Sequence, residues 1–189
     1  MNVLEKYAAN CGVKINDPFV GTSYFPLIDK PYIVFDNRNK YGTNIYDLFH
    51  DVMTYIKPAL DREGIEAISF EKNEKDILEG AKPYLGLFKK QENYLIKNSK
   101  LVVACDNLSN YVASGLKVPS VGLYSVYPKV CTQPMWSDSY IAIESHRDGN
   151  LPAYGVPENP KTVNFIEPEK VADAIFKSST SCRSIKLRI

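Results

Sequence analysis

The sequence predicts one α/β domain built on a mainly parallel β-sheet, and three observations support this prediction. From residue 31 onward, short runs of β-branched and aromatic residues alternate with polar turns and helical patterns. A length of 189 residues is typical of one domain. No internal repeat interrupts the alternation. Alternating strands and helices favour a parallel sheet with helices on both faces.

The first thirty residues differ from the rest of the chain. Residues 4–12 have the pattern of a short helix that ends at Gly12. Residues 17–31 contain three prolines and a glycine, which indicates an extended, irregular segment. We therefore expect residues 1–30 to form an arm that packs on the main domain or on a partner. The main domain is expected at 31–180, and residues 181–189 form a short basic tail without an assigned role.

The main domain is expected to contain about six strands. The predicted strands are 32–36, 65–71, 84–88, 101–105, 120–125 and 140–145. The predicted helices are 49–63, 73–81, 91–99, 107–116 and 167–179. Pro58 is expected to kink or restart the first of these helices, and Gly64 to close it. This order of elements is typical of a Rossmann-like fold.

Composition excludes several classes of function. A formal charge of +1 argues against broad binding to nucleic acid. The four cysteines form no C-x-x-C pair and only two histidines are present, so neither a zinc site nor another cofactor is expected. The N-terminus has no signal-peptide pattern, and no run approaches the length of a membrane-spanning helix. We expect a cytoplasmic protein with free thiols.

Polar residues follow each predicted strand. Ligands of open parallel sheets bind outside the carboxyl ends of the strands, at the point where the strand order reverses. In the loop 37–44, Arg38 and Lys40 can neutralise a phosphate. The other candidate donors in this loop are Asn37, Gly42 and Thr43. The loop matches neither G-x-G-x-x-G nor the P-loop pattern, so ordinary solvated loops remain the alternative interpretation.

The segment 105–125 is a strand–helix–strand unit whose first strand ends at Asp106. Asn107 and Ser109 lie at the expected start of the helix, where backbone N–H groups can bind a pyrophosphate, and Ser125 follows the second strand. The alternative interpretation is a plain structural unit with Asp106 as the helix N-cap.

This segment resembles the donor-binding half of GT-B glycosyltransferases, most of all glycosyltransferase family 9, the ADP-heptose transferases. That family has a D-T-G-x-x-H turn, a small-residue helix and a G-K-P-V-V-A-L-F-G strand. Asp106 matches the aspartate of the motif, and the spacing through Gly115 and Pro119 to Ser125 agrees. The stretches 126–136 and 86–92 also resemble the family.

The resemblance covers residues 31 to about 179 and has clear departures. Asn107 and Leu108 replace the Thr and Gly of the motif, and Tyr111 replaces its His, so the role of that histidine is not carried over. The family has a second, N-terminal domain that binds the acceptor, and residues 1–30 are too short to replace it. The resemblance implies a nucleoside-diphosphate sugar as substrate. Either another subunit supplies the acceptor site, or the domain binds this ligand without catalysing transfer.

A third candidate site is the loop 144–150, which follows the last predicted strand. His146 can act as a general base near neutral pH, and Arg147 can bind a phosphate bidentately. The alternative is a surface loop with an incidental histidine.

Two functional hypotheses follow. The first is a glycosyltransferase-like protein that binds a nucleoside-diphosphate sugar, with Asn37, Arg38, Lys40, Gly42, Thr43, Asp106, Asn107, Ser109, Ser125 and Arg147 at the nucleotide and His146 as base. The second is a non-catalytic nucleotide-binding or assembly protein on the same fold. The arm is the expected contact of a homo-oligomer or partner subunit.

Overall fold

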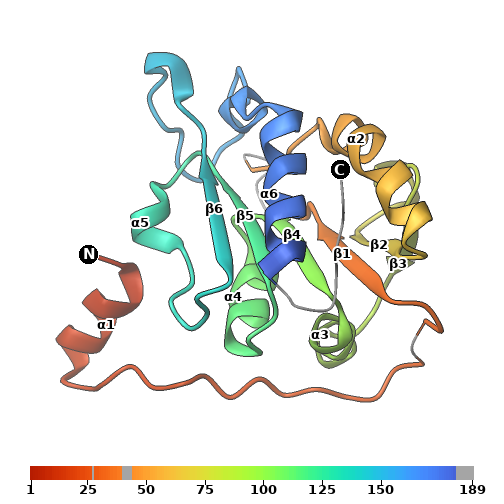
Figure 1. Ribbon diagram of the computed structural model, residues 1–189. Coiled ribbons are helices and arrows are strands. Elements are labelled where there is room, and N and C mark those ends of the chain that lie inside the picture. Colours follow the sequence, from red (N-terminus) through yellow and green to blue (C-terminus); the bar gives the residue numbers. More distant parts are fainter. Residues whose placement is uncertain (27, 40–43, 182–189) are drawn as a thin grey trace.

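The computed structural model describes residues 1–26, 28–39 and 44–181 (Figure 1). The six strands are β1 (Tyr32–Asp36), β2 (Glu66–Glu71), β3 (Lys82–Leu85), β4 (Leu101–Cys105), β5 (Ser120–Tyr124) and β6 (Tyr140–Glu144). All pair in parallel, in the order β3-β2-β1-β4-β5-β6. The predicted Rossmann-like α/β fold is therefore confirmed, and the strand order reverses between β1 and β4.

Helices cover both faces of this sheet (Figure 1). The α-helices are α1 (Val3–Cys11), α2 (Phe49–Arg62), α3 (Lys89–Asn98), α4 (Leu108–Gly115), α5 (Lys129–Thr132) and α6 (Pro168–Ser181). Single 3₁₀ turns are η1 (Glu74–Asp76), η2 (Arg147–Gly149) and η3 (Thr162–Phe165). No helix among the described residues is long and apolar enough to cross a membrane.

The core has two layers because successive side chains of a strand point to opposite faces. In β1, Ile33 and Phe35 pack with α2 and α6, while Tyr32 and Val34 pack with α3 and α4. Every residue of β1 and β4 is buried, which explains why both strands read as continuous apolar runs.

The helix α2 continues through Pro58, so the chain does not restart a helix there, which was one of the two outcomes expected at this proline. Pro58 lies on the exposed side of the helix, whereas Val52, Ile56 and Leu60 are buried against the sheet. Proline removes the N–H that would bond the carbonyl one turn earlier, and packing of the buried face stabilises the helix across this gap.

Two other element predictions were wrong. Within residues 73–81, a single turn, η1 (Glu74–Asp76), replaces the predicted helix, and Gly80 has a φ of +85°, outside the helical range. The third strand spans Lys82–Leu85 instead of 84–88, because Gly86 turns the chain with a φ of +67°.

The N-terminal arm packs along the outer side of its own domain (Figure 1). Val20, Phe25 and Ile28 cover the core layer beneath α3 and α4. The Trp136 indole donates to the Asn16 carbonyl at 3.0 Å, and the Asn93 amide donates to the Gly21 carbonyl at 2.9 Å. The arm thus completes one face of the domain, while α1 itself buries no residue.

Candidate functional site

An open hollow of about 490 Å³ lies at the carboxyl ends of β1 and β4. We call it the switch-point hollow, and it is lined by Asp36, Arg38, Asn39, Lys72, Lys89, Asn107 and Leu108. Three of these residues are cations and one is a carboxylate. It lies where the strand order reverses, which is where ligands bind in folds of this type.

Arg38 is held at the wall of the hollow by two carboxylates. Its Nε and Nη2 donate to the two oxygens of Asp36 at 2.8 and 2.9 Å, and its Nη1 donates to Glu92 at 2.5 Å. The guanidinium carbon also lies 5.1 Å from the centre of the Phe70 ring. Asp36 and Glu92 are almost fully buried, so Arg38 neutralises charge that the fold has already buried.

Two lysines complete the positive side of the hollow. The Lys89 ammonium donates to Glu92 at 2.8 Å, and its side chain remains 63% exposed. The exposed Lys72 ammonium donates to the Asn39 carbonyl at 2.6 Å. Both ammonium groups have further donors available for a ligand, since each carries three N–H bonds.

The N-terminus of α4 reaches the same hollow. Asn107 is the N-cap and accepts the Ser109 N–H at 2.9 Å, so the structural alternative with Asp106 as N-cap was wrong. The Asn107 amide also donates to the Asp36 carbonyl at 3.0 Å, and the Ser109 hydroxyl donates to the Asp36 carboxylate at 2.6 Å. These bonds fix the helix start against the end of β1.

Asp106 is partly buried behind this helix. The Thr132 hydroxyl donates to its carboxylate at 3.1 Å. Burial raises the pKa of Asp106 to about 6, and the Thr132 hydrogen bond offsets only part of that effect. The Tyr111 hydroxyl, which stands where the family's motif has histidine, donates to the Thr132 carbonyl.

Replacing Asp106 with Asn is expected to stabilise the fold above about pH 6. Its folded pKa of about 6 exceeds the ordinary 3.8, so the folded state binds the proton more tightly. The wild type should therefore recover stability as pH falls from about 7 towards 4. We expect Asp106→Asn to add about 1–2 kcal/mol near pH 7.5 and nothing near pH 4. Urea unfolding of both proteins across this range measures the difference, and a pH-independent gap would contradict the assignment.

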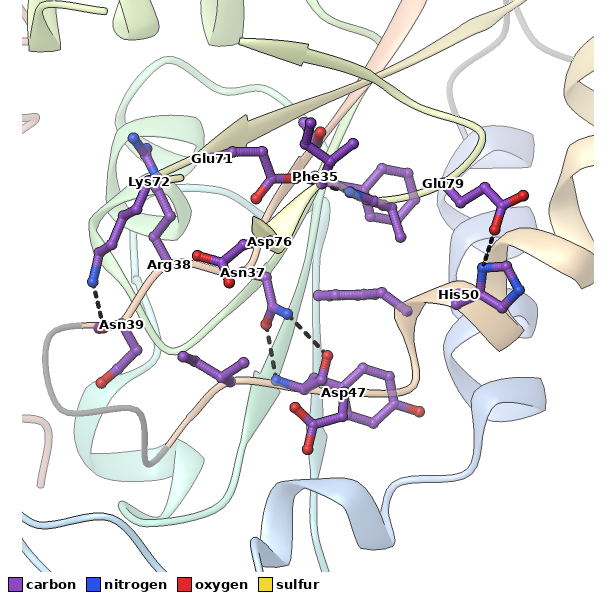
Figure 2. A pocket seen from close by; sticks show the side chains of 16 residues that line it. Phe35, Asn37, Arg38, Asn39, Asp47, His50, Glu71, Lys72, Asp76 and Glu79 are labelled. Carbon is purple, nitrogen blue, oxygen red and sulfur yellow. Dashed lines mark hydrogen bonds and ion pairs between the residues drawn. The ribbon is translucent and has the colours of Figure 1, made fainter. Parts of the chain in front are cut away.

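A second opening lies on the α2 side of the loop that follows β1 (Figure 2). We call this 420 Å³ space the β2-end cavity. It shares Arg38, Asn39 and Lys72 with the switch-point hollow. Its polar wall includes Asp47, Glu71, Asp76 and Glu79, and its apolar wall includes Phe49, Ile77 and Leu78.

Asn37 shapes the boundary of the β2-end cavity. Its amide donates to the Tyr46 carbonyl at 2.9 Å and its side-chain oxygen accepts the Tyr46 N–H at 2.8 Å. Figure 2 shows both bonds below the end of β1. Of the other residues predicted in this loop, Lys40, Gly42 and Thr43 lie outside the described residues.

Arg147 and Ser125 lie together after β6 and β5, at the same edge of the sheet but on the side of β4 away from β1. Arg147 donates to the Ser125 carbonyl at 2.8 Å, to Thr162 at 2.8 Å and to Glu158 at 2.7 Å. The chain takes left-handed φ values of 56° at Arg147 and 48° at Asp148, a conformation that these contacts hold. The structure therefore gives Arg147 internal partners, and its contact with a phosphate stays a prediction.

His146 is exposed and packs against the Phe165 ring, with 5.6 Å between the ring centres. It follows β6, which lies two strands beyond β4. At ~4.8 Å between neighbouring strands, β6 is roughly 10 Å from β4 across the sheet. The structure groups Asn37, Arg38, Asn107 and Ser109 around β1 and β4, and places Ser125, His146 and Arg147 in a separate group.

Sequence reasoning missed the partners that complete the hollow. The helical pattern around Glu92 predicts an exposed side chain, whereas the structure buries it in an ion pair with Arg38. Lys72 and Lys89 follow predicted strands, and their position after a strand was the available signal. Among the residues that the structure describes, no group of His, Cys, Asp and Glu is placed to hold a metal ion.

Comparison with solved structures finds the same fold in other proteins. The chain superposes on E. coli ADP-heptose LPS heptosyltransferase II with a TM-score of 0.61 and 17% identity, over 95% of this chain and 52% of that one. The chain has the fold of half a heptosyltransferase. This confirms, at the level of fold, the resemblance drawn from residues 105–125 and its neighbouring segments.

Two further structures give the same result. TibC of enterotoxigenic E. coli, a dodecameric iron-containing heptosyltransferase solved with ADP-D-β-D-heptose, matches with a TM-score of 0.67 and 12% identity, over 90% of this chain and 51% of that one. A family 9 glycosyltransferase of Veillonella parvula matches with a TM-score of 0.59 and 14% identity, over 92% and 49%. The chain thus spans about half the length of these proteins. No family model and no curated protein matches the sequence.

Proposed function

We propose that the switch-point hollow binds the pyrophosphate of a nucleoside-diphosphate sugar. The observation that carries this proposal is the meeting of Lys72, Lys89 and the N-terminus of α4 at the point where the strand order reverses. Ammonium groups and helix N-termini are the groups that bind phosphate oxygens in such folds. The solved structure of TibC with ADP-D-β-D-heptose supports the same class of ligand.

The two lysines are the proposed primary contacts, because Arg38 already holds two buried carboxylates. Arg38 adds positive potential and fixes the wall. Asn107 and Ser109 hold the helix start in position, and Asp106 lies behind them. The predicted contacts of Asn37, Ser125 and Arg147 with the nucleotide remain part of this proposal.

For the reaction, we propose direct displacement of the nucleoside diphosphate. An acceptor hydroxyl attacks the anomeric carbon, the bond from that carbon to the phosphate oxygen breaks, and the acceptor proton passes to His146. The departing phosphate gains negative charge, which Lys72, Lys89 and the α4 N-terminus stabilise. The acceptor would be presented by a partner, for which the arm is the proposed contact. The described cysteines are free, which suits the proposed cytoplasmic location.

The test is nucleotide binding, followed by variants. A thermal-shift screen should identify a stabilising ligand among ADP, UDP, GDP, dTDP and their sugar conjugates. We expect Lys89→Ala to lower the affinity for that ligand by about 10-fold, which corresponds to the loss of one charged hydrogen bond. Lys97→Ala, at the other end of the same helix, is the matched control and should bind normally. Full affinity in Lys89→Ala would remove this lysine from the site, and His146→Ala with full transfer activity would remove the proposed base.

A second candidate function is nucleotide binding or assembly without turnover. It is favoured by the internal partners of Arg38, Arg147 and Tyr111, which are committed to the fold itself. Nucleotide binding without transfer to any acceptor would support it, whereas no shift with any nucleotide in the screen would favour assembly.

A further inference from the structure

Glu71 is a buried carboxylate at the inner wall of the β2-end cavity. It ends β2, is 6% exposed, and lies on the same side of the strand as Ser69, two residues earlier. Figure 2 shows its side chain reaching towards the space between Asn37 and Asp76. A buried carboxylate normally has a cation or several strong donors as partners.

Glu71 lacks such partners within the described part of the chain. Its hydrogen bond is a long one, from the Leu78 N–H at 3.3 Å, and no Lys, Arg or His among the described residues forms an ion pair with it. Burial raises the pKa of Glu71, and the neighbouring Asp36 and Asp76 add to this effect. The Ser69 hydroxyl lies near enough to oppose the rise but makes no hydrogen bond of normal length with a described residue.

Other polar groups around the cavity already have partners. Asp47 accepts from Lys161 at 2.8 Å and from Asn164 at 2.8 Å. His50 lies 3.5 Å from Glu79 at the rim, as Figure 2 shows. Of the acidic side chains in this wall, Glu71 is therefore the buried one without an ion pair among the described residues, and it lies beside the apolar side chains of Ile77 and Leu78. Lys72 also lines the cavity, and its ammonium keeps the further donors described above.

We propose that the β2-end cavity binds a small organic ligand through a protonated primary amine, which donates to the Glu71 carboxylate. The Ser69 hydroxyl bonds a neighbouring hydroxyl of the ligand, and the ligand's carbon skeleton contacts Ile77 and Leu78. The volume of 420 Å³ falls in the range of small-molecule pockets, roughly 300–1,000 Å³. The cavity adjoins the switch-point hollow through Arg38, Asn39 and Lys72, but Glu71 and Ser69 line the β2-end cavity and not the hollow. The proposal does not depend on nucleotide binding in the hollow.

The probes are ethanolamine and glucosamine, with ethylene glycol and glucose as their uncharged counterparts. In ¹H–¹⁵N NMR titrations near pH 7, we expect the two amines to shift amide signals of residues 69–79 and the uncharged probes to leave them in place. Binding of glucosamine should be at least about 10-fold tighter than that of glucose, as one charged hydrogen bond provides.

Glu71→Gln keeps the shape of the side chain and removes its charge. We expect this variant to fold, since the substitution removes an uncompensated buried charge. We also expect it to lower the affinity for both amines by about 10-fold or more. Glu66→Gln makes the same change at the other end of β2 and should bind like the wild type. If Glu71→Gln does not fold, Ser69→Ala serves instead and should weaken glucosamine by about 3-fold or more.

Three results would overturn the proposal. The first is the absence of shifts from either amine at concentrations up to about 10 mM, beyond which affinity is negligible. The second is equal binding of glucose and glucosamine. The third is unchanged glucosamine affinity in a folded Glu71→Gln variant. Because nucleotides are absent from these titrations, failure here leaves the test of the switch-point hollow unaffected.

Discussion

Arg38→Ala is expected to lower the free energy of unfolding by about 3–5 kcal/mol, the range found when one partner of a buried ion pair is removed. The substitution leaves Asp36 and Glu92 buried without their main cation, at 4% and 5% side-chain exposure. It also removes the guanidinium that packs on Phe70. Urea denaturation of the wild type and the variant measures the loss directly.

Two further variants distinguish charge from packing. Arg38→Lys keeps the charge but cannot reach both carboxylates with the same planar geometry, so we expect an intermediate loss. Adding Glu92→Gln to Arg38→Ala removes one of the two uncompensated charges and should restore part of the stability. A loss below about 1 kcal/mol for Arg38→Ala would mean that solvent reaches these carboxylates, and the pair would then behave as a surface pair.

Gly122→Ala is the second substitution with a large expected effect. A Cβ at this position would lie 1.8 Å from the Tyr140 hydroxyl oxygen and 2.8 Å from the ring carbon that carries it. Tyr140 lies across β5 and its hydroxyl shares a hydrogen bond with Tyr124. The ring must move to admit even one methyl group, so we expect a loss of about 2–3 kcal/mol.

Thermal or urea unfolding checks this prediction, with Gly21→Ala as the control. The nearest atom to a Cβ at Gly21 is 3.7 Å away, so that variant should be close to neutral. In a double-mutant cycle, Tyr140→Phe should recover part of the loss, because it removes the closest atom but keeps the ring. Wild-type stability in Gly122→Ala would show that Tyr140 has another position available.

The sequence predicted the strands of this fold better than its connections. β1 and β4 match the predicted ranges 32–36 and 101–105 because both are buried on two faces, which leaves an apolar run with clear ends. The segment 73–81 was predicted wrongly because its apolar residues line a cavity and do not form the buried face of a helix. Ile77 and Leu78 line the β2-end cavity, and Gly80 turns the chain into β3.

The sequence predicted where the candidate site lies, but not which of its side chains form ion pairs with one another. Parallel strands end at one edge, so polar residues after them gather there whatever the rest of the sequence is. Which of them remain available depends on side chains far along the chain. Glu92 pairs with Arg38 across 54 positions, and no local pattern signals that contact. A similar contact with Glu158 occupies Arg147.

The strand order has a consequence for how ligand and fold depend on each other. Among the described residues, the strands of 32–85 and those of 101–144 pair with each other along β1 and β4, where Ile33 pairs with Leu101. Pairing β1 with β4 brings together parts of the chain about 70 residues apart, so forming this contact costs conformational entropy. The switch-point hollow is lined by Lys72, which follows β2 in the first half, and by Asn107, which follows β4 in the second half. A molecule bound there would contact both halves of the sheet. Its binding would stabilise the pairing of β1 with β4, and the paired sheet would in turn bind it more tightly.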